Sequence, residues 1–261
     1  MKKIIRIIML VLLIAIIVVS SICLYKELSE RKIQNDEYEN LLMLFENVSD
    51  NHEDDFRNKN KSEADNLSSE EKVTSKSYNF DSIKNINSDV VGWIKIDGTK
   101  VNYPVMQNSN DSNYYLHRNI YKSYSSIGSI YVPNICNIKN ADNIILYGHH
   151  IKDGSMFGSL TKYKSYNYFK EHKYIKLMTD ESSFSDYEIM AIIVTNVEDF
   201  NYYGFTKAEN QNQFNEYVRQ CRSMSIFETG VQANYGDKLV TLVTCEYSQN
   251  NGRMIIVAKK I

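Results

Sequence analysis

Three things are scarce or missing in this sequence of 261 residues, and each argues against a class of protein. The formal net charge is only −2, so the chain as a whole has no electrostatic basis for binding nucleic acid. Cysteine is scarce, and the four cysteines include no Cys-x-x-Cys pair, which argues against a zinc site and against thioredoxin-like redox chemistry. We expect no metal and no organic cofactor. An Ala-x-Ala-like cleavage site is missing near the N-terminus, which argues against a removable secretory signal.

A long apolar run is present instead, at residues 7–25. It is uncharged and close to the length that crosses a bilayer, and Lys2, Lys3 and Arg6 precede it. Basic residues also follow the run, interleaved with glutamates, so charge favours a cytoplasmic N-terminus only modestly. We predict a cytoplasmic tail at residues 1–6 and a transmembrane signal-anchor at residues 7–25.

Residues 26–78 have the composition of a helical and flexible stalk. A helix is expected at residues 28–47, with a short apolar patch at residues 41–45. Residues 48–77 are dominated by Ser, Asn, Asp, Glu and Lys, and such a segment buries too little apolar surface to order itself. We expect it to be a flexible spacer that lifts a domain at residues 79–261 off the membrane.

The segment after residue 79 alternates short apolar, β-branched stretches with turn signals, which predicts a mainly β domain. The chain is 43% hydrophobic and 12% aromatic, which is ample for a core. Asp97-Gly98 predicts a hairpin with a two-residue primed turn. Further strands are expected at residues 128–132, 143–147, 174–179 and 187–197, and helices at residues 157–163 and 208–224.

The clearest chemical signal is a predicted hairpin near the C-terminus, with strands at residues 239–247 and 253–257 and a turn-like segment between them. Side chains alternate across a strand, so a register that sets odd positions opposite odd ones places Cys245 and Arg253 on one surface. A thiol beside a fixed cation suggests a reactive cysteine, because a positive field favours thiolate. For an arbitrary pair, a buried structural cysteine and a solvated arginine would be the better interpretation.

A histidine far upstream changes that balance. Residues 143–147 are expected to form a strand that runs directly into Gly148-His149-His150, and the glycine would let the backbone turn sharply. Histidine exchanges protons near neutral pH, and Cys with His is a recurrent nucleophile–base pair. His149 is the candidate base, and His150 is the alternative at the adjacent position.

Together these motifs resemble those of the class B sortases, membrane-anchored cysteine transpeptidases of Gram-positive bacteria. The resemblance covers roughly residues 79–261. It rests on the Thr-Leu-x-Thr-Cys strand at residues 241–245, the arginine on the following strand and the upstream histidine, with further matches at residues 89–94, 103–107 and 147–157. The sequence departs from some class B members at Tyr247, where they carry an acidic residue, so no catalytic aspartate is predicted.

The resemblance implies a sortase-type closed β-barrel of about eight strands with peripheral helices, preceded by the transmembrane helix and stalk. It implies catalysis by Cys245, His149 and Arg253, and Thr244 and Tyr247 are candidates for substrate binding. The expected substrates are surface proteins with an N-P-x-T-like C-terminal sorting signal, cleaved after Thr. The acyl group would pass to an amine of a peptidoglycan precursor. Class B sortases hold the N-terminus in the cytoplasm and the catalytic domain, expected to be monomeric, outside the cell.

Two other functions stay open at this point. The same residues would make a cysteine peptidase if water rather than an amine resolved the acyl intermediate, although no papain-like or caspase-like signature surrounds Cys245. A non-catalytic, membrane-tethered binding domain would instead have an unreactive Cys245. Alkylation of the thiol separates this second alternative from an enzyme.

Overall fold

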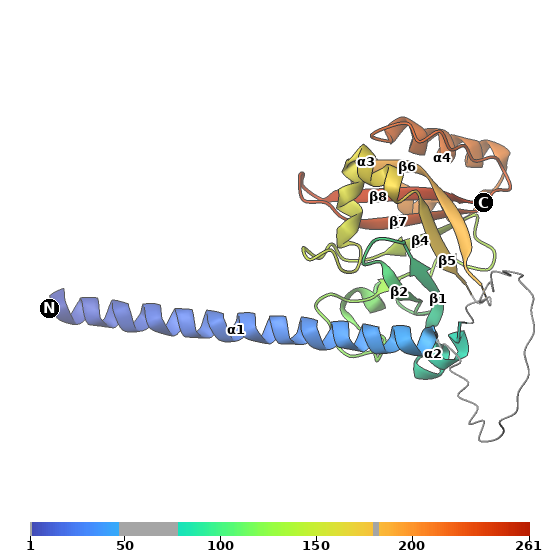
Figure 1. Cartoon of the computed structure of the whole chain (residues 1–261). Helices are drawn as coiled ribbons and strands as arrows, with labels where there is room; N and C mark the ends of the chain where they lie inside the picture. The colour runs from blue at the N-terminus through green and yellow to red at the C-terminus, as the bar shows by residue number, and fades with distance from the viewer. Residues whose placement is uncertain (1, 47–77, 180–182) are drawn as a thin grey trace, which may run out of the picture.

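The structure is a computed structural model that describes residues 2–46, 78–179 and 183–261. Figure 1 shows one long helix that leads into a β-barrel. The helical elements are α1 (Lys2–Phe45), α2 (Phe80–Ile86), η1 (Tyr114–His117), η2 (Gly158–Lys164), α3 (Tyr166–Glu171), η3 (Tyr202–Gly204) and α4 (Gln211–Met224). The strands are β1 (Val90–Lys95), β2 (Asn102–Met106), β3 (Ile130–Tyr131), β4 (Asn143–Tyr147), β5 (Tyr174–Met178), β6 (Ser185–Asn196), β7 (Leu239–Cys245) and β8 (Gly252–Lys260).

The eight strands close into a barrel in the order β1-β2-β3-β4-β7-β8-β6-β5. The pairs β2–β3 and β4–β7 are parallel, and the other neighbours are antiparallel. Each strand expected from the sequence is present, with ends that differ by a few residues. The predicted mainly β, closed-barrel fold with peripheral helices is therefore confirmed.

Alternating side chains of the central strands supply two cores. Val240 and Leu242 of β7 belong to the cluster that fills the barrel, whereas Leu239 and Val243 belong to a second cluster outside it. Helix α4 covers this second cluster with a buried stripe that includes Phe214, Val218 and Cys221, as the helical spacing predicted. Strand β7 is thus buried on both faces, and Cys245 at its end is its one partly exposed residue.

The turn between β1 and β2 differs from the prediction. A two-residue turn at Asp97-Gly98 would join Ile96 and Thr99 by two hydrogen bonds. The Thr99 N–H does donate to the Ile96 carbonyl at 3.2 Å, but the Ile96 N–H donates to the Val101 carbonyl at 2.9 Å. The Thr99 hydroxyl donates to the Ile96 carbonyl and accepts from the Val101 N–H. A longer turn is therefore stabilised by a threonine side chain that the dipeptide signal did not include.

Helix α1 is one uninterrupted element that includes both the apolar run and the first part of the expected stalk. The helix is long and apolar enough to cross a membrane, by length and composition. Further along it, Gln34, Tyr38, Leu41 and Phe45 are buried against the barrel, at the spacing of one helix face. The Phe45 ring stacks on Trp93 of β1, with ring centroids 4.0 Å apart. That residues 79–261 fold independently of the segment before them stays a prediction. The end of α1 nevertheless contributes side chains to the core that fills the barrel.

The polar segment at residues 48–77, expected to be a flexible spacer, lies outside the described residues. Its two flanks are in direct contact: the Asn79 N–H donates to the Phe45 carbonyl at 2.8 Å, and the Tyr78 ring stacks on Phe45. The residues on either side of this segment thus lie next to each other at the barrel. The end of α1 itself contacts the barrel, so the described residues already link the apolar run to the barrel, and the flexible spacer stays a prediction.

Candidate functional site

Cys245 and Arg253 lie opposite each other at one end of the β7–β8 hairpin. Cys245 is the last residue of β7, and the antiparallel register pairs it directly with Arg253, the second residue of β8. The odd-to-odd register predicted from the turn is confirmed. Gly252 closes the turn, and a Cβ there would lie 2.2 Å from the Glu246 carbonyl oxygen, so only glycine fits this position.

His149 reaches the same edge through a parallel pairing. Strands β4 and β7 run side by side with Tyr147 in register with Val243, and the Gly148 N–H donates to the Val243 carbonyl at 3.2 Å. His149 and Cys245 each lie two residues beyond these partners. Gly148 does not have a positive φ; its role is close packing, since a Cβ there would lie 2.5 Å from the Ile130 side chain. The expected reason for this glycine, a sharp turn, is thus replaced by a steric one.

The His149 ring has a defined tautomer. Its Nε2 lies 2.8 Å from the carbonyl oxygen of Leu116 in η1, and a carbonyl only accepts, so Nε2 carries a proton. Nδ1 is left as the nitrogen that can exchange one. Burial lowers the pKa of His149 below its usual 6.5; the Leu116 carbonyl opposes this shift, and the nearby His117 ring adds to it. The neutral imidazole is therefore favoured at neutral pH.

His150, the alternative base, has a different set of contacts. Its Nδ1 donates to the Cys245 carbonyl at 3.1 Å, and its ring stacks on Tyr247 with centroids 5.2 Å apart. These contacts hold the end of β7 next to the loop after β4. We therefore assign His150 a supporting contact and keep His149 as the candidate proton carrier.

A group of tyrosines surrounds the thiol and the guanidinium, and sequence reasoning did not find it. Burial raises the pKa of Tyr202 in η3, while Arg253 opposes that shift through its charge and a hydrogen bond. Burial and the charge of Cys245 raise the pKa of Tyr131 in β3 to about 12. The Tyr131 ring stacks on Tyr147 of β4, with centroids 5.5 Å apart. Only Tyr147, which precedes Gly-His, had a motif that pointed to this site.

Arg253 is held in place by its own chain. Its Nη1 donates to the Gly252 carbonyl at 2.9 Å, and the Tyr202 contact fixes the other part of the side chain. The guanidinium is partly buried, which strengthens its interaction with any charge that develops nearby. A planar donor group thus lies beside a thiol at the barrel edge.

The two candidate substrate-binding residues have opposite environments. Thr244 points into the barrel with 2% of its surface exposed, so its side chain is not presented to a substrate in this structure. Tyr247 is 72% exposed and flanks Cys245. Between them, Glu246 is buried, forms an ion pair with Lys164 at 2.5 Å and accepts from the Ser248 N–H. Glu246 thereby fixes the turn that follows the cysteine.

The other cysteines are separate from this edge. Cys136 and Cys221 are fully buried free thiols in the two different core clusters, and burial raises the pKa of both, that of Cys221 to about 12. Among the described residues, Cys245 is the partly exposed thiol of the barrel. No group of His, Cys, Asp or Glu in the described ranges is arranged to hold a metal ion.

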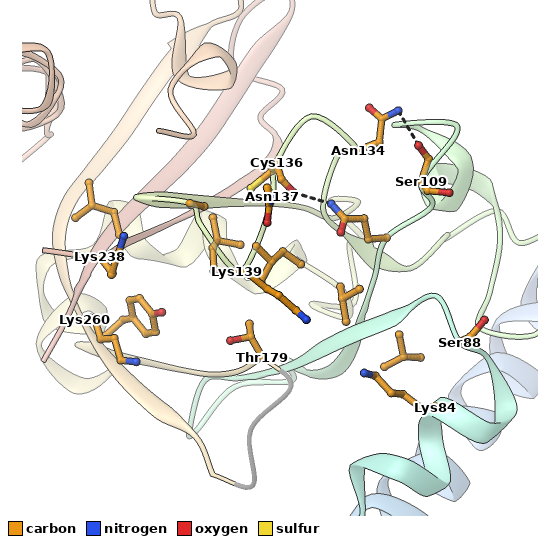
Figure 2. A pocket seen from close by; sticks show the side chains of 18 residues that line it. Lys84, Ser88, Ser109, Asn134, Cys136, Asn137, Lys139, Thr179, Lys238 and Lys260 are labelled. Carbon is orange, nitrogen blue, oxygen red and sulfur yellow. Dashed lines mark hydrogen bonds between the residues drawn. The ribbon is translucent and has the colours of Figure 1, made fainter. Parts of the chain in front are cut away.

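A cavity of about 820 Å³ lies at the other end of the barrel, and Figure 2 shows the side chains that line it. Residues at the starts of β4 and β7 and at the end of β8 line it, together with Lys84, Lys139, Lys238 and Lys260. Cys245, His149 and Arg253 lie at the opposite ends of these strands. The cavity is therefore not part of the cysteine site.

Comparison with known proteins agrees with this geometry. The Sortase domain family model matches residues 94–261. Sortase B of Staphylococcus aureus is 28% identical over 264 residues, covering 100% of this chain and 98% of its own. Sortase B of Listeria monocytogenes is 32% identical over 182 residues, covering 69% of this chain and 72% of its own. The crystal structure of Clostridium perfringens sortase B superposes with a TM-score of 0.66 at 35% identity, covering 69% of this chain and 98% of that one.

Proposed function

The chain belongs to the sortase family, in class B, and on that premise we propose that it cleaves a C-terminal sorting signal after Thr and joins the acyl group to an amine. The observation that supports this most strongly is the pairing of Cys245 with Arg253 at the edge that His149 also reaches. A thiol, a planar cation and a proton carrier at one edge are the groups that amide exchange requires.

The first half-reaction forms a thioester. The Cys245 thiolate attacks the carbonyl carbon of the Thr residue, and the electron pair of the carbonyl moves onto its oxygen. The Arg253 guanidinium stabilises that oxyanion. When the tetrahedral intermediate collapses, the C–N bond breaks and protonated His149 donates a proton to the leaving amine. The product is an acyl group bonded to the Cys245 sulfur.

The second half-reaction returns the enzyme to its starting state. An incoming amine attacks the thioester carbonyl, and neutral His149 accepts the proton that this amine loses. Collapse of the intermediate breaks the C–S bond and releases the thiolate. Because burial lowers the pKa of His149, the thiolate–imidazolium form is a minor fraction, and the pair titrates as a coupled unit.

We propose a membrane location with the N-terminus in the cytoplasm and the catalytic domain outside. The exposed apolar part of α1, preceded by Lys3 and Arg6, supports a signal-anchor. The proposed partners are surface proteins with an N-P-x-T-like signal and an amine of a peptidoglycan precursor. Tyr247, exposed beside the thiol, is the proposed contact for the sorting peptide.

The test uses a fragment of residues 26–261, which retains the packed end of α1 but lacks the apolar run. This fragment and its Cys245→Ala, Cys136→Ala and Cys221→Ala variants are incubated with a library of N-P-x-T-like peptides, with and without triglycine as the amine. We expect a thioacyl adduct and a peptide–triglycine product from the parent and from the two core variants, detected by mass spectrometry. Cys245→Ala should give neither, and cleavage by that variant would disprove the mechanism.

The same experiment separates the alternatives. Hydrolysis in the presence of triglycine, but no joined product, would favour the cysteine peptidase. No cleavage, together with a Cys245 that iodoacetamide labels no faster than the buried Cys136 and Cys221, would favour the binding domain.

A further inference from the structure

Helix α1 joins the apolar run to the barrel without a break. It spans Lys2–Phe45 and contains neither glycine nor proline. Its Ser20-Ser21 pair lies within the apolar run, where the Ser21 hydroxyl donates to the Ile17 carbonyl at 2.8 Å, and not between Leu24 and the barrel. Its apolar side chains from Ile4 to Leu24 are exposed, which suits contact with lipid rather than with protein. The segment that would leave the membrane is therefore already part of a continuous rod.

The far end of this rod is fixed to the barrel by polar and aromatic contacts. The Gln34 side chain donates to the Gly128 carbonyl at 3.1 Å and accepts from the Ser125 hydroxyl at 2.6 Å. The Tyr38 ring packs edge-on against Tyr103 of β2, and Phe45 stacks on Trp93. Because these contacts occupy three helical turns on one face, they fix both the rotation and the height of the helix against the barrel.

The direction of the rod sets which end of the barrel faces the bilayer. Near the membrane, Arg31 lies close to Asp153, in the loop after His149. Burial alone would raise the pKa of that carboxyl, but the Ser155 hydrogen bonds and then the charges of Lys100 and Arg31 bring it below its usual value. Gln34 binds Ser125, whose own N–H donates to the carbonyl of His117 in η1, next to the residue that holds His149. At the far end of α1, Phe45 contacts Phe184, which directly precedes the start of β6.

Strand β6 confirms that direction. It starts beside Phe184 and runs toward Thr195, which pairs with Arg253 of the catalytic edge. From its N-terminal to its C-terminal end, α1 therefore runs in the direction that leads from the catalytic edge to the opposite end of the barrel (Figure 1). Along the helix axis, the ten residues from Leu24 to Gln34 span only about 15 Å.

We propose that α1 is a rigid spacer that turns the Cys245 edge toward the bilayer at a fixed height, so that the enzyme selects substrates embedded in the same membrane. This inference rests on the proposed function. On this proposal, a substrate held in the membrane by its own apolar segment is cleaved best when its scissile bond lies a set distance from that segment, and α1 sets this distance. A soluble peptide with the same sequence lacks that constraint and is accepted independently of α1.

The test measures cleavage against distance, with the full-length enzyme in lipid vesicles. The substrates carry the best N-P-x-T-like peptide from the library, a polar spacer of varied length and a transmembrane helix. One variant has seven alanine-rich helical residues inserted after Glu30. The insert lengthens α1 by about 10.5 Å and rotates its barrel-facing side by only about 20° relative to the apolar run. We expect the preferred spacer to lengthen by about three extended residues. A flexible Gly-Ser insert of the same length should broaden the preference instead.

Two controls make the outcome decisive. Replacing residues 48–77 by a short Gly-Ser linker should leave the preferred spacer unchanged, because the two flanks of that segment already meet at Phe45 and Asn79. All variants should cleave the soluble peptide equally. If the helical insert leaves the preferred spacer unchanged, or if the 48–77 replacement shifts it, the rigid-spacer proposal is wrong. If the parent enzyme does not cleave even the soluble peptide, the proposed function itself fails.

Discussion

The contact between Phe45 and Trp93 allows a sharp test of whether the end of α1 belongs to the folded unit. Phe45 is 1% exposed, and its ring stacks on Trp93 with an interplanar angle of 5°. Tyr78 and Phe184 flank the same ring. Truncating a buried Phe to Ala typically costs 3–5 kcal/mol, so we expect Phe45→Ala to lower the free energy of unfolding by about 4 kcal/mol. In a domain of this size, that corresponds to a drop in melting temperature of about 10 °C.

The assay is urea unfolding of the 26–261 fragment, followed by the fluorescence of Trp93, the one tryptophan in the sequence. Because Trp93 is fully buried under Phe45, its emission should shift to longer wavelength in the variant before any unfolding. Met43→Ala is the matched control, since Met43 is 65% exposed on the same helix and should change stability by less than about 0.5 kcal/mol. Equal effects of the two substitutions, with unchanged native emission, would refute the packing of α1 as part of the core. A fragment of residues 79–261 should then be as stable as the longer one, whereas we expect it to be less stable.

Three further predictions concern the site. Arg253→Lys should reduce peptide turnover nearly as much as Arg253→Ala, on the order of a hundredfold, because an ammonium cannot reproduce two parallel donors. Turnover near that of the parent in the lysine variant would mean that Arg253 contributes only its charge. Because burial lowers the pKa of His149 below 6.5, the unfolded chain binds a proton at this residue at a higher pH than the folded chain does, and the free energy of unfolding should decrease below about pH 6.5. His149→Gln should make this decrease smaller, as measured by urea unfolding midpoints at pH 7.5 and 5.5. Glu246→Ala should lower peptide turnover, because it removes the ion pair with Lys164 and loosens the turn after Cys245. Glu228→Ala removes an ion pair with Arg222 at the surface and should leave turnover unchanged. Equal turnover in the two variants would show that the Glu246 contacts are dispensable.

Local chemistry explains which parts of the site could be predicted. The distance between Cys245 and Arg253 along the chain is short, so the turn length alone constrains their register, and parity decides that they share a face. His149 could be placed only as a residue just past a strand. Its position beside Cys245 depends on the parallel pairing of β4 with β7, whose partners are almost a hundred residues apart.

The failures have equally specific causes. Thr244 adjoins Cys245 in the sequence, but strand alternation sends its side chain into the barrel, away from the face that carries Cys245. The Asp97-Gly98 signal counts two residues, whereas the hydroxyl of Thr99 stabilises a longer turn. Tyr202 reaches Arg253 from the connection between β6 and α4, and no local pattern marks a contact of that kind.

By itself, the sequence determined the strands, the apolar helix, and the pairing of the candidate nucleophile with its cationic partner, because period, composition and short turns act over a few residues. The tertiary structure alone decided that α1 docks on the barrel, that Phe45 and Asn79 on either side of the polar segment lie side by side, and that the Cys245 edge is the end nearer the apolar run. Those features depend on contacts such as Phe45 with Trp93 and Gln34 with Gly128, which join residues far apart in the chain. Such contacts form only when the whole barrel provides a surface to bury them, and that surface exists in no local segment.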